Sequence, residues 1–110
     1  MTEELELILF QIITAAGGSK SSYIGAIQEA KAGNIEAAKR LVKEGDEFQS
    51  QAHDPHAKLL TQEAQLATEG KNSADLVCLL LIHAEDQMMS CEVFKQMAEE
   101  FIDLYEKIGS

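Results

Sequence analysis

The chain of 110 residues has no tryptophan, one proline and two cysteines. Cationic side chains are also few: 9 Lys and Arg residues stand against 19 Asp and Glu residues, which gives a formal net charge of −10. This balance argues against nucleic-acid binding, which requires a basic face, and against docking on anionic lipid. It permits a basic protein partner, although acidity of this kind chiefly promotes solubility.

Long apolar runs and reactive cysteine motifs are missing as well. The longest apolar run, Leu76 to Ile82, is far shorter than the ~20 residues that a membrane-spanning helix needs. The N-terminus has no basic, signal-like start. Cys78 and Cys91 lie outside any Cys-x-x-Cys pattern, which favours two reduced, buried thiols. We therefore expect a cytoplasmic protein that does not insert into a membrane.

The residues that are abundant point to helices. Hydrophobic residues make up 45% of the chain, which is enough for one compact core. Ala, Glu, Leu, Lys and Gln are frequent, whereas Val and Thr are scarce, and this composition favours an all-α fold. The sequence predicts a single domain over residues 1–110, an antiparallel three-helix bundle with helices over about 2–31, 34–68 and 73–107.

The ends and weak points of these helices can be read from individual residues. Thr2 is expected to cap the first helix, and Gly33 to end it before Asn34 caps the second. A break is expected near residues 17–18, where two glycines produce either a kink or a close helix contact. Pro55 is expected to bend or divide the second helix, and Asn72 or Ser73 to cap the third.

A polar interruption in an apolar helical stripe is the feature that points to function. In the last predicted helix, apolar residues recur at three- and four-residue steps, and the same steps land in the middle on His83, Asp86, Gln87 and Ser90. Burying such groups without partners costs on the order of 1–3 kcal/mol each. We therefore expect this face to meet another subunit, with His83 at the mouth of an intersubunit groove. The apolar members of the stripe are Leu76, Leu79, Leu80, Val93, Phe94, Met97, Phe101, Leu104 and Ile108.

His83 and Asp86 lie three residues apart and so share a helix face. A neutral imidazole, with a reference pKa of about 6.5, is a competent phosphoryl acceptor near pH 7. The alternative for His83 is a hydrogen-bonded interior histidine. Asp86 either orients His83, binds a cation, or points to solvent or to a lysine. Gln87 and Ser90 are possible donors to an anion or ordinary interface groups.

A second histidine pair, His53 and His56, lies on the second predicted helix. Together with His83 and Asp86 it forms a possible metal site in the bundle. The alternative is a solvated pair near the bend at Pro55.

The chain resembles the lactose/cellobiose-type enzyme IIA of the bacterial sugar phosphotransferase system over nearly its whole length. The strongest match is the segment His83-Ala84-Glu85-Asp86-Gln87-Met88-Met89, which is similar to the family pattern His-x-Gln-Asp-His-Leu-Met. Three shorter segments also match: Ala16-Gly17-Gly18-Ser19-Lys20-Ser21 (Ala-Gly-x-Ala-Arg-Ser), Ala32-Gly33-Asn34-Ile35-Glu36-Ala37-Ala38 (the first turn), and Gln51-Ala52-His53 (Glu-Ala-His).

The resemblance implies a homotrimer of three-helix protomers and a phosphoryl relay. His83 matches the histidine that accepts the phosphoryl group from the histidine-phosphorylated carrier protein and passes it to a cysteine of enzyme IIB. This relay supports the uptake of β-glycosides of the cellobiose or lactose type. Asp86 matches the aspartate that binds a divalent cation, Mg²⁺, at the trimer axis. Gln87 is then a candidate phosphate contact, and His53 and His56 are expected to line the cleft.

The sequence departs from the family pattern close to the site. Glu85 replaces a Gln, Gln87 replaces a His, and His53-Asp54-Pro55-His56-Ala57 stands where the family has His-x-x-Gln-Thr. Gln87 donates hydrogen bonds but carries no positive charge. Two alternatives therefore stay open: a non-catalytic helical interaction or regulatory module that has lost transfer, and a bundle metalloprotein.

Overall fold

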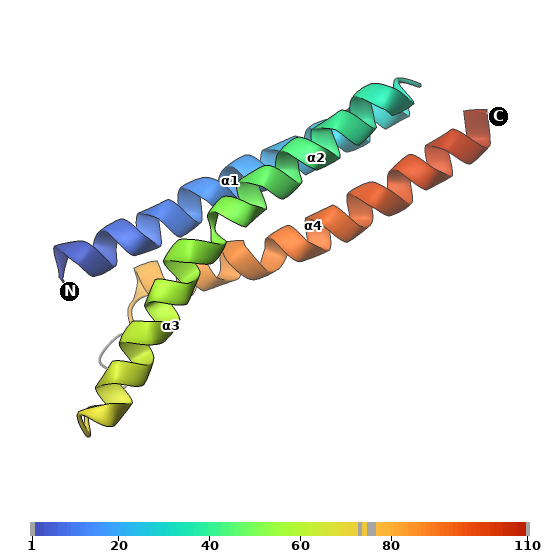
Figure 1. The fold of residues 1–110 in the computed structure, drawn as a ribbon. Helices are drawn as coiled ribbons and strands as arrows, with labels where there is room; N and C mark the ends of the chain where they lie inside the picture. Colours follow the sequence, from blue (N-terminus) through green and yellow to red (C-terminus); the bar gives the residue numbers. More distant parts are fainter. Residues whose placement is uncertain (1, 73, 75–76, 110) are drawn as a thin grey trace.

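The computed structural model describes residues 2–72, 74 and 77–109, and these form four helices. They are α1 (Glu3–Lys31), α2 (Ile35–Gln51), α3 (His53–Thr68) and α4 (Leu79–Gly109). Only Ala52 separates α2 from α3, so these two helices form one bent arm, which follows α1 and precedes α4 along the chain (Figure 1). No strand occurs in the described part of the chain, and the predicted antiparallel three-helix bundle is confirmed.

The bundle is long and thin, with extents of 60 × 19 × 19 Å. The described N- and C-terminal residues lie at opposite ends of it, and α1 packs against both α2 and α4 (Figure 1). None of the described helices is long and apolar enough to cross a membrane.

Most helix ends follow the prediction. The Thr2 Oγ1 atom accepts a hydrogen bond from the Leu5 amide at 3.1 Å, which caps α1. Gly33, with φ of 91°, lies in the left-handed region and ends the turn after α1. Asn34 stands at the N-cap of α2, but its side chain donates to Glu29 at 2.8 Å and does not cap the helix.

The predicted break near residues 17–18 is wrong, because α1 continues through both glycines. A Cβ atom on Gly18 would lie 2.8 Å from Cδ1 of Phe48, whereas one on Gly17 would meet nothing within 4 Å. The missing side chain at Gly18 therefore gives the Phe48 ring of α2 room against α1. Of the two expected alternatives, the structure therefore shows a close helix contact, and it is made at Gly18.

The predicted second helix over 34–68 is divided at Ala52, three residues before the proline. Pro55 has no N–H, and its ring excludes a helical carbonyl at Gln51. As the third residue of α3, however, Pro55 occupies one of the first positions, where no N–H has an intrahelical acceptor. Interrupting the helix at Ala52 therefore lets Pro55 sit in helical conformation at little cost.

The predicted start of the third helix at residue 73 is also wrong, because α4 begins at Leu79. The Asn72 Oδ1 atom accepts a hydrogen bond from the Ala74 amide at 2.9 Å, so Asn72 closes a local turn and does not cap α4. Ser73, the other predicted cap, lies outside the described residues.

The core consists of two apolar clusters at different heights of the bundle. One cluster joins the first half of α1 to α3 and α4, and the other joins the second half of α1 to α2 and α4. Most members are aliphatic residues of moderate size or alanines, which lets thin helices approach closely. The clusters contain Leu5, Ile8, Leu9, Ile12, Leu59 and Ala84, and Ala26, Ala30, Ala38 and Ile102.

A polar network around the buried Tyr23 side chain occupies the middle of the bundle. The Tyr23 hydroxyl, on a side chain that is fully buried, donates to Asp46 Oδ1 at 2.6 Å and contacts Gln49 Oε1 at 3.0 Å. Asp46 also pairs with Lys95 at 3.2 Å, and the Gln49 amide donates to Glu92. The network therefore connects α1 and α2 to α4 through polar groups that satisfy one another.

Helix α4 has apolar residues on two sides. Its inner side, with Ala84, Cys91, Ala98 and Ile102, is buried against the other helices. Its outer side is exposed, and we name these residues the outer α4 stripe: Leu79, Ile82, Met89, Val93, Met97, Leu104 and Ile108. The structure thus divides the predicted stripe, because Leu80, Phe94 and Phe101 are partly buried while the other described members face outward: Leu79, Val93, Met97, Leu104 and Ile108. Leu76 lies outside the described residues.

Candidate functional site

The His83 side chain lies on the exposed surface of α4, in its second turn. The same side of the helix carries Leu79 and Asp86, which are exposed, and Gln87, which is partly buried. Among the residues that the structure describes, none donates to or accepts from the imidazole. The alternative of a hydrogen-bonded interior histidine is therefore wrong for the single chain, and the ring nitrogens are open to a reaction partner.

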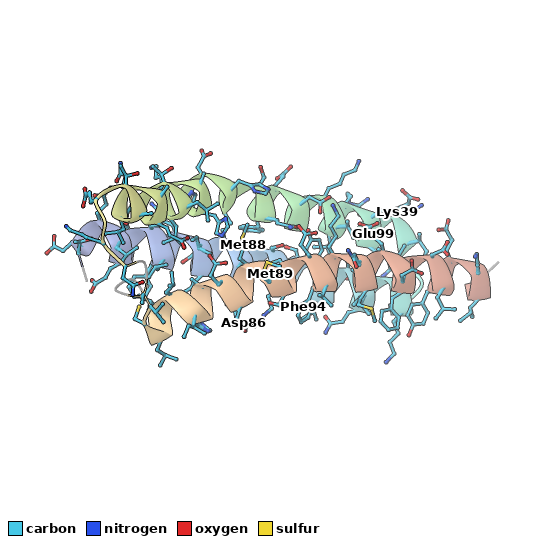
Figure 2. The ribbon with its side chains drawn as sticks, turned by 90° about the horizontal axis from the view of Figure 1, so that it is seen from below. Lys39, Asp86, Met88, Met89, Phe94 and Glu99 are labelled. Carbon is cyan, nitrogen blue, oxygen red and sulfur yellow. The ribbon has the colours of Figure 1, made fainter. Side chains whose placement is uncertain are left out.

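Asp86 is exposed and lies in register with the outer α4 stripe, between Ile82 and Met89. Ile82 is 56% exposed and Met89 66%, so the carboxylate is the polar member of an apolar surface. Figure 2 shows Asp86 on the side of α4 turned away from α2 and α3, and Met88 on the opposite side. No described cation pairs with Asp86, and it makes no hydrogen bond to His83 within the described chain.

Gln87 connects the site to α1. Its Oε1 atom accepts a hydrogen bond from the Lys20 ammonium at 3.0 Å, and the same ammonium lies 5.0 Å from the centre of the Phe94 ring. The Ser90 hydroxyl donates to the Gln87 carbonyl at 3.1 Å, so its proton is used within α4. Among the predicted polar residues of this face, Gln87 is thus brought into contact with a cation, the Lys20 ammonium.

Lys20 is the residue that the sequence reasoning missed as a member of this site. It lies in the segment Ala16–Ser21 that carried part of the family resemblance, where the family pattern has Arg. A cation within a glycine-rich helix segment of a strongly acidic chain is the signal that marks it.

The second histidine pair lies elsewhere. His53 is exposed at the start of α3, whereas the His56 Nε2 atom lies 2.8 Å from Glu85 Oε1. Glu85 follows His83 by two residues, so its side chain leaves α4 in a different direction. In the described part of the chain no three His, Cys, Asp or Glu side chains gather as a metal site. The predicted bundle metal site of His53, His56, His83 and Asp86 is therefore not formed.

Neither cysteine contributes a reactive centre next to His83. Both thiols are free; Cys91 is fully buried and Cys78 partly buried. The Cys91 Sγ atom donates to the carbonyls of Gln87 at 3.2 Å and Ala16 at 3.4 Å. Burial raises the pKa of the Cys91 thiol, which disfavours the thiolate. The prediction of a reduced, buried thiol is thus confirmed for Cys91, whereas Cys78 is free but only partly buried.

Comparison with known sequences assigns the chain to a protein family. Residues 7–106 match the family model described as "PTS system, Lactose/Cellobiose specific IIA subunit". The chain is 40% identical to a lichenan-specific phosphotransferase enzyme IIA component of Bacillus subtilis over 98% of this chain and 93% of the relative. It is 31% identical to a lactose-specific EIIA component of Staphylococcus epidermidis over 96% and 95% of the two chains.

Two solved structures share the fold. A cellobiose-specific enzyme IIA from Bacillus anthracis superimposes with a TM-score of 0.83 at 34% identity, covering 99% of this chain and 94% of that one. A chitobiose-specific IIA of Escherichia coli, solved as a complex with HPr, gives a TM-score of 0.72 at 27% identity and covers 99% and 100%.

Proposed function

The chain belongs to the lactose/cellobiose-specific IIA family of the sugar phosphotransferase system, and on this premise we propose that it carries a phosphoryl group on His83. The observation that supports His83 most directly is its exposure without a described hydrogen-bond partner, inside the segment His83–Met89. A phosphoryl donor can reach such a ring, and a neutral imidazole is nucleophilic near pH 7.

The relay consists of two balanced transfers. In the first, the phosphorus–nitrogen bond of a histidine-phosphorylated carrier protein breaks, a phosphorus–nitrogen bond to His83 forms, and the donor imidazole leaves. In the second, a cysteine thiolate of enzyme IIB attacks the phosphorus, and the His83 imidazole leaves as the P–S bond forms. The E. coli neighbour in complex with HPr supports the first partner. Because phosphoryl transfer depends chiefly on positioning and charge stabilisation, an exposed ring with nearby donors is sufficient machinery.

The same relay assigns the chain a place in sugar uptake. The relatives are named for lichenan, lactose and cellobiose, which are β-linked glycans or disaccharides. We therefore expect the chain to act in the cytoplasm on behalf of a β-glycoside transporter.

The outer α4 stripe supports assembly into a homotrimer. Seven large apolar side chains are exposed along one side of α4, and a surface of this kind marks a protein interface. Around a threefold axis, three copies of Asp86 approach one another inside this apolar surface. Their oxygen donors suit a divalent cation such as Mg²⁺, which offsets the repulsion among the carboxylates. One chain alone does not bring such ligands together.

Phosphorylation followed by intact-mass measurement tests the proposal. The chain is incubated with phosphoenolpyruvate, enzyme I and the carrier protein, and we expect a mass gain of one phosphoryl group that His83→Ala abolishes. His53→Ala and His56→Ala are matched controls, because each removes an imidazole outside the α4 site and is expected to retain the gain. Absence of the gain in the unaltered chain, or its survival in His83→Ala, supports the non-catalytic interaction module instead.

A further inference from the structure

The contact between Lys20 and Gln87 has a consequence for the charge that the site must hold. We propose that the Lys20 ammonium, together with the Gln87 amide, binds the phosphoryl group carried on His83. This inference rests on the proposed function and adds a cationic phosphoryl-binding residue from α1.

The contact with Gln87 brings the Lys20 ammonium to the side of α4 that carries His83. Gln87 follows His83 by one helical turn, so the two side chains are neighbours, with Cβ atoms about 5–6 Å apart. The Lys20 Nζ atom lies 3.0 Å from Gln87 Oε1. The cation therefore sits beside the surface next to the imidazole, on the α1 side.

Lys20 differs from the other lysines that contact α4 or a turn. Lys39, Lys95 and Lys71 each have a carboxylate oxygen within 4.0 Å. Lys20 is partly buried, yet in the described part of the chain its ammonium meets an amide oxygen and the Phe94 ring, and no carboxylate. Its charge is thus not neutralised locally and is available to an anion.

The chain requires such a cation because its own field opposes the phosphoryl group. The net charge is −10, and a phosphoryl group adds a charge of about −2 at neutral pH. Gln87 itself is neutral, so it cannot supply a compensating charge. A charge-assisted hydrogen bond from Lys20 stabilises the phosphorylated ring where a neutral donor alone would be weaker.

Lys20 also fixes the orientation of Gln87. Because the amide oxygen accepts from the ammonium, the amide nitrogen is the end that remains to donate. No described residue accepts from this nitrogen. The Phe94 ring holds the ammonium from a third side through a cation–π contact, so both donors are ordered before the phosphoryl group arrives.

Substitution of Lys20 tests the inference. We expect Lys20→Met to slow phosphoryl transfer to His83 by about tenfold or more and to shorten the lifetime of the phosphorylated chain, as loss of a charge-assisted hydrogen bond predicts. Lys20→Arg is expected to restore much of both quantities. Lys43→Met on α2 removes the same charge from an exposed position and is expected to change neither.

A second measurement keeps the inference testable should Lys20→Met fold poorly. In the unaltered chain, phosphorylation is expected to shift the ¹⁵Nζ resonance of Lys20 and to leave that of Lys43 in place. Transfer rates and lifetimes equal to those of the unaltered chain in Lys20→Met, or an unmoved Lys20 resonance, overturn the role of Lys20. If the unaltered chain is not phosphorylated on His83 at all, the proposed function fails first, and the two failures are thereby distinguished.

Discussion

His56 of α3 and Glu85 of α4 form a close pair in which Nε2 and Oε1 lie 2.8 Å apart. Both residues stand at positions where the chain departs from the family motifs, which have Gln at each. The two departures therefore contact each other. The pair links α3 to α4, on the far side of the interruption at Ala52 that separates α3 from α2.

We expect a double-mutant cycle on this pair to reveal a modest coupling. His56→Ala and Glu85→Ala are measured singly and together by urea unfolding. The side chains are 25% and 40% exposed, so a coupling free energy of about 0.2–1 kcal/mol is expected, falling as salt is added. Strictly additive effects of the two substitutions would show that the contact contributes nothing.

Asp86→Leu is expected to stabilise the assembly. In the proposed trimer the substitution would replace a buried carboxylate with apolar packing along the outer α4 stripe, an exchange typically neutral or favourable by about 1–4 kcal/mol. The measurement is the melting temperature in the presence of a chelator at several chain concentrations. Glu99→Leu is the control, because it adds a leucine to α4 outside the outer α4 stripe (Figure 2). A lower melting temperature for Asp86→Leu under chelator contradicts the assignment of Asp86 to an interface.

The Tyr23 network predicts a loss of stability in alkali. Burial, and then the hydrogen bond to Asp46, raise the pKa of the Tyr23 phenol well above its usual value of 10.0. A raised pKa in the folded chain stabilises it fully below about pH 10 and progressively less as the pH rises above that value. Each pH unit in this window costs about 1.4 kcal/mol until the folded pKa is reached.

Tyr23→Phe tests this pH dependence by urea unfolding between about pH 7 and pH 11. At neutral pH the variant is expected to be less stable by about 1–3 kcal/mol, because Gln49 and Asp46 lose a buried donor. Above about pH 10 its stability is expected to fall less steeply than that of the unaltered chain. Cys91 titrates in the same direction but is present in both chains, so it does not alter the comparison. Parallel pH profiles for the two chains would refute the prediction.

Replacement of glycine by alanine is expected to have opposite effects on stability at Gly45 and at Gly17. A Cβ atom on Gly45 would lie 2.5 Å from Cε1 of the buried Tyr23 ring, so Gly45→Ala is expected to cost about 1–3 kcal/mol through overpacking. Gly17 meets nothing within 4 Å, and Gly17→Ala is expected to stabilise α1 by about 0.5–1 kcal/mol. Thermal or urea unfolding measures both, and a gain in stability for Gly45→Ala would contradict the packing described.

The sequence predicted those parts of the fold that depend on local residue chemistry. The cap at Thr2, the turn at Gly33 and the helical class follow from side-chain and backbone preferences within a few residues. The interruption at Ala52 was placed too late because Pro55 ends a helix upstream of itself, at the turn whose carbonyl it excludes. The close helix contact at Gly18 depends on Phe48, thirty residues away, and no local pattern contains that information.

The site was predicted in part for the same reason. The position of His83 in an apolar pattern marked it, and its exposure agrees with a role toward a partner. The pattern did not separate the inner from the outer side of α4, because apolar residues on both sides merge into one broad stripe. Lys20 was missed because its relation to Gln87 is a contact between α1 and α4, which spacing along either helix does not reveal.

The polar network around Tyr23 fixes the register of α1, α2 and α4 along the bundle axis. Alanines and small aliphatic residues fill the clusters on either side of it, and such smooth surfaces would let antiparallel helices slide by a turn with little penalty. A slip of that size would leave the buried Tyr23 hydroxyl without Asp46 and the buried Gln49 amide without Glu92. The network therefore fixes the axial register of the helices. This register in turn sets the distance between Lys20 of α1 and His83 of α4.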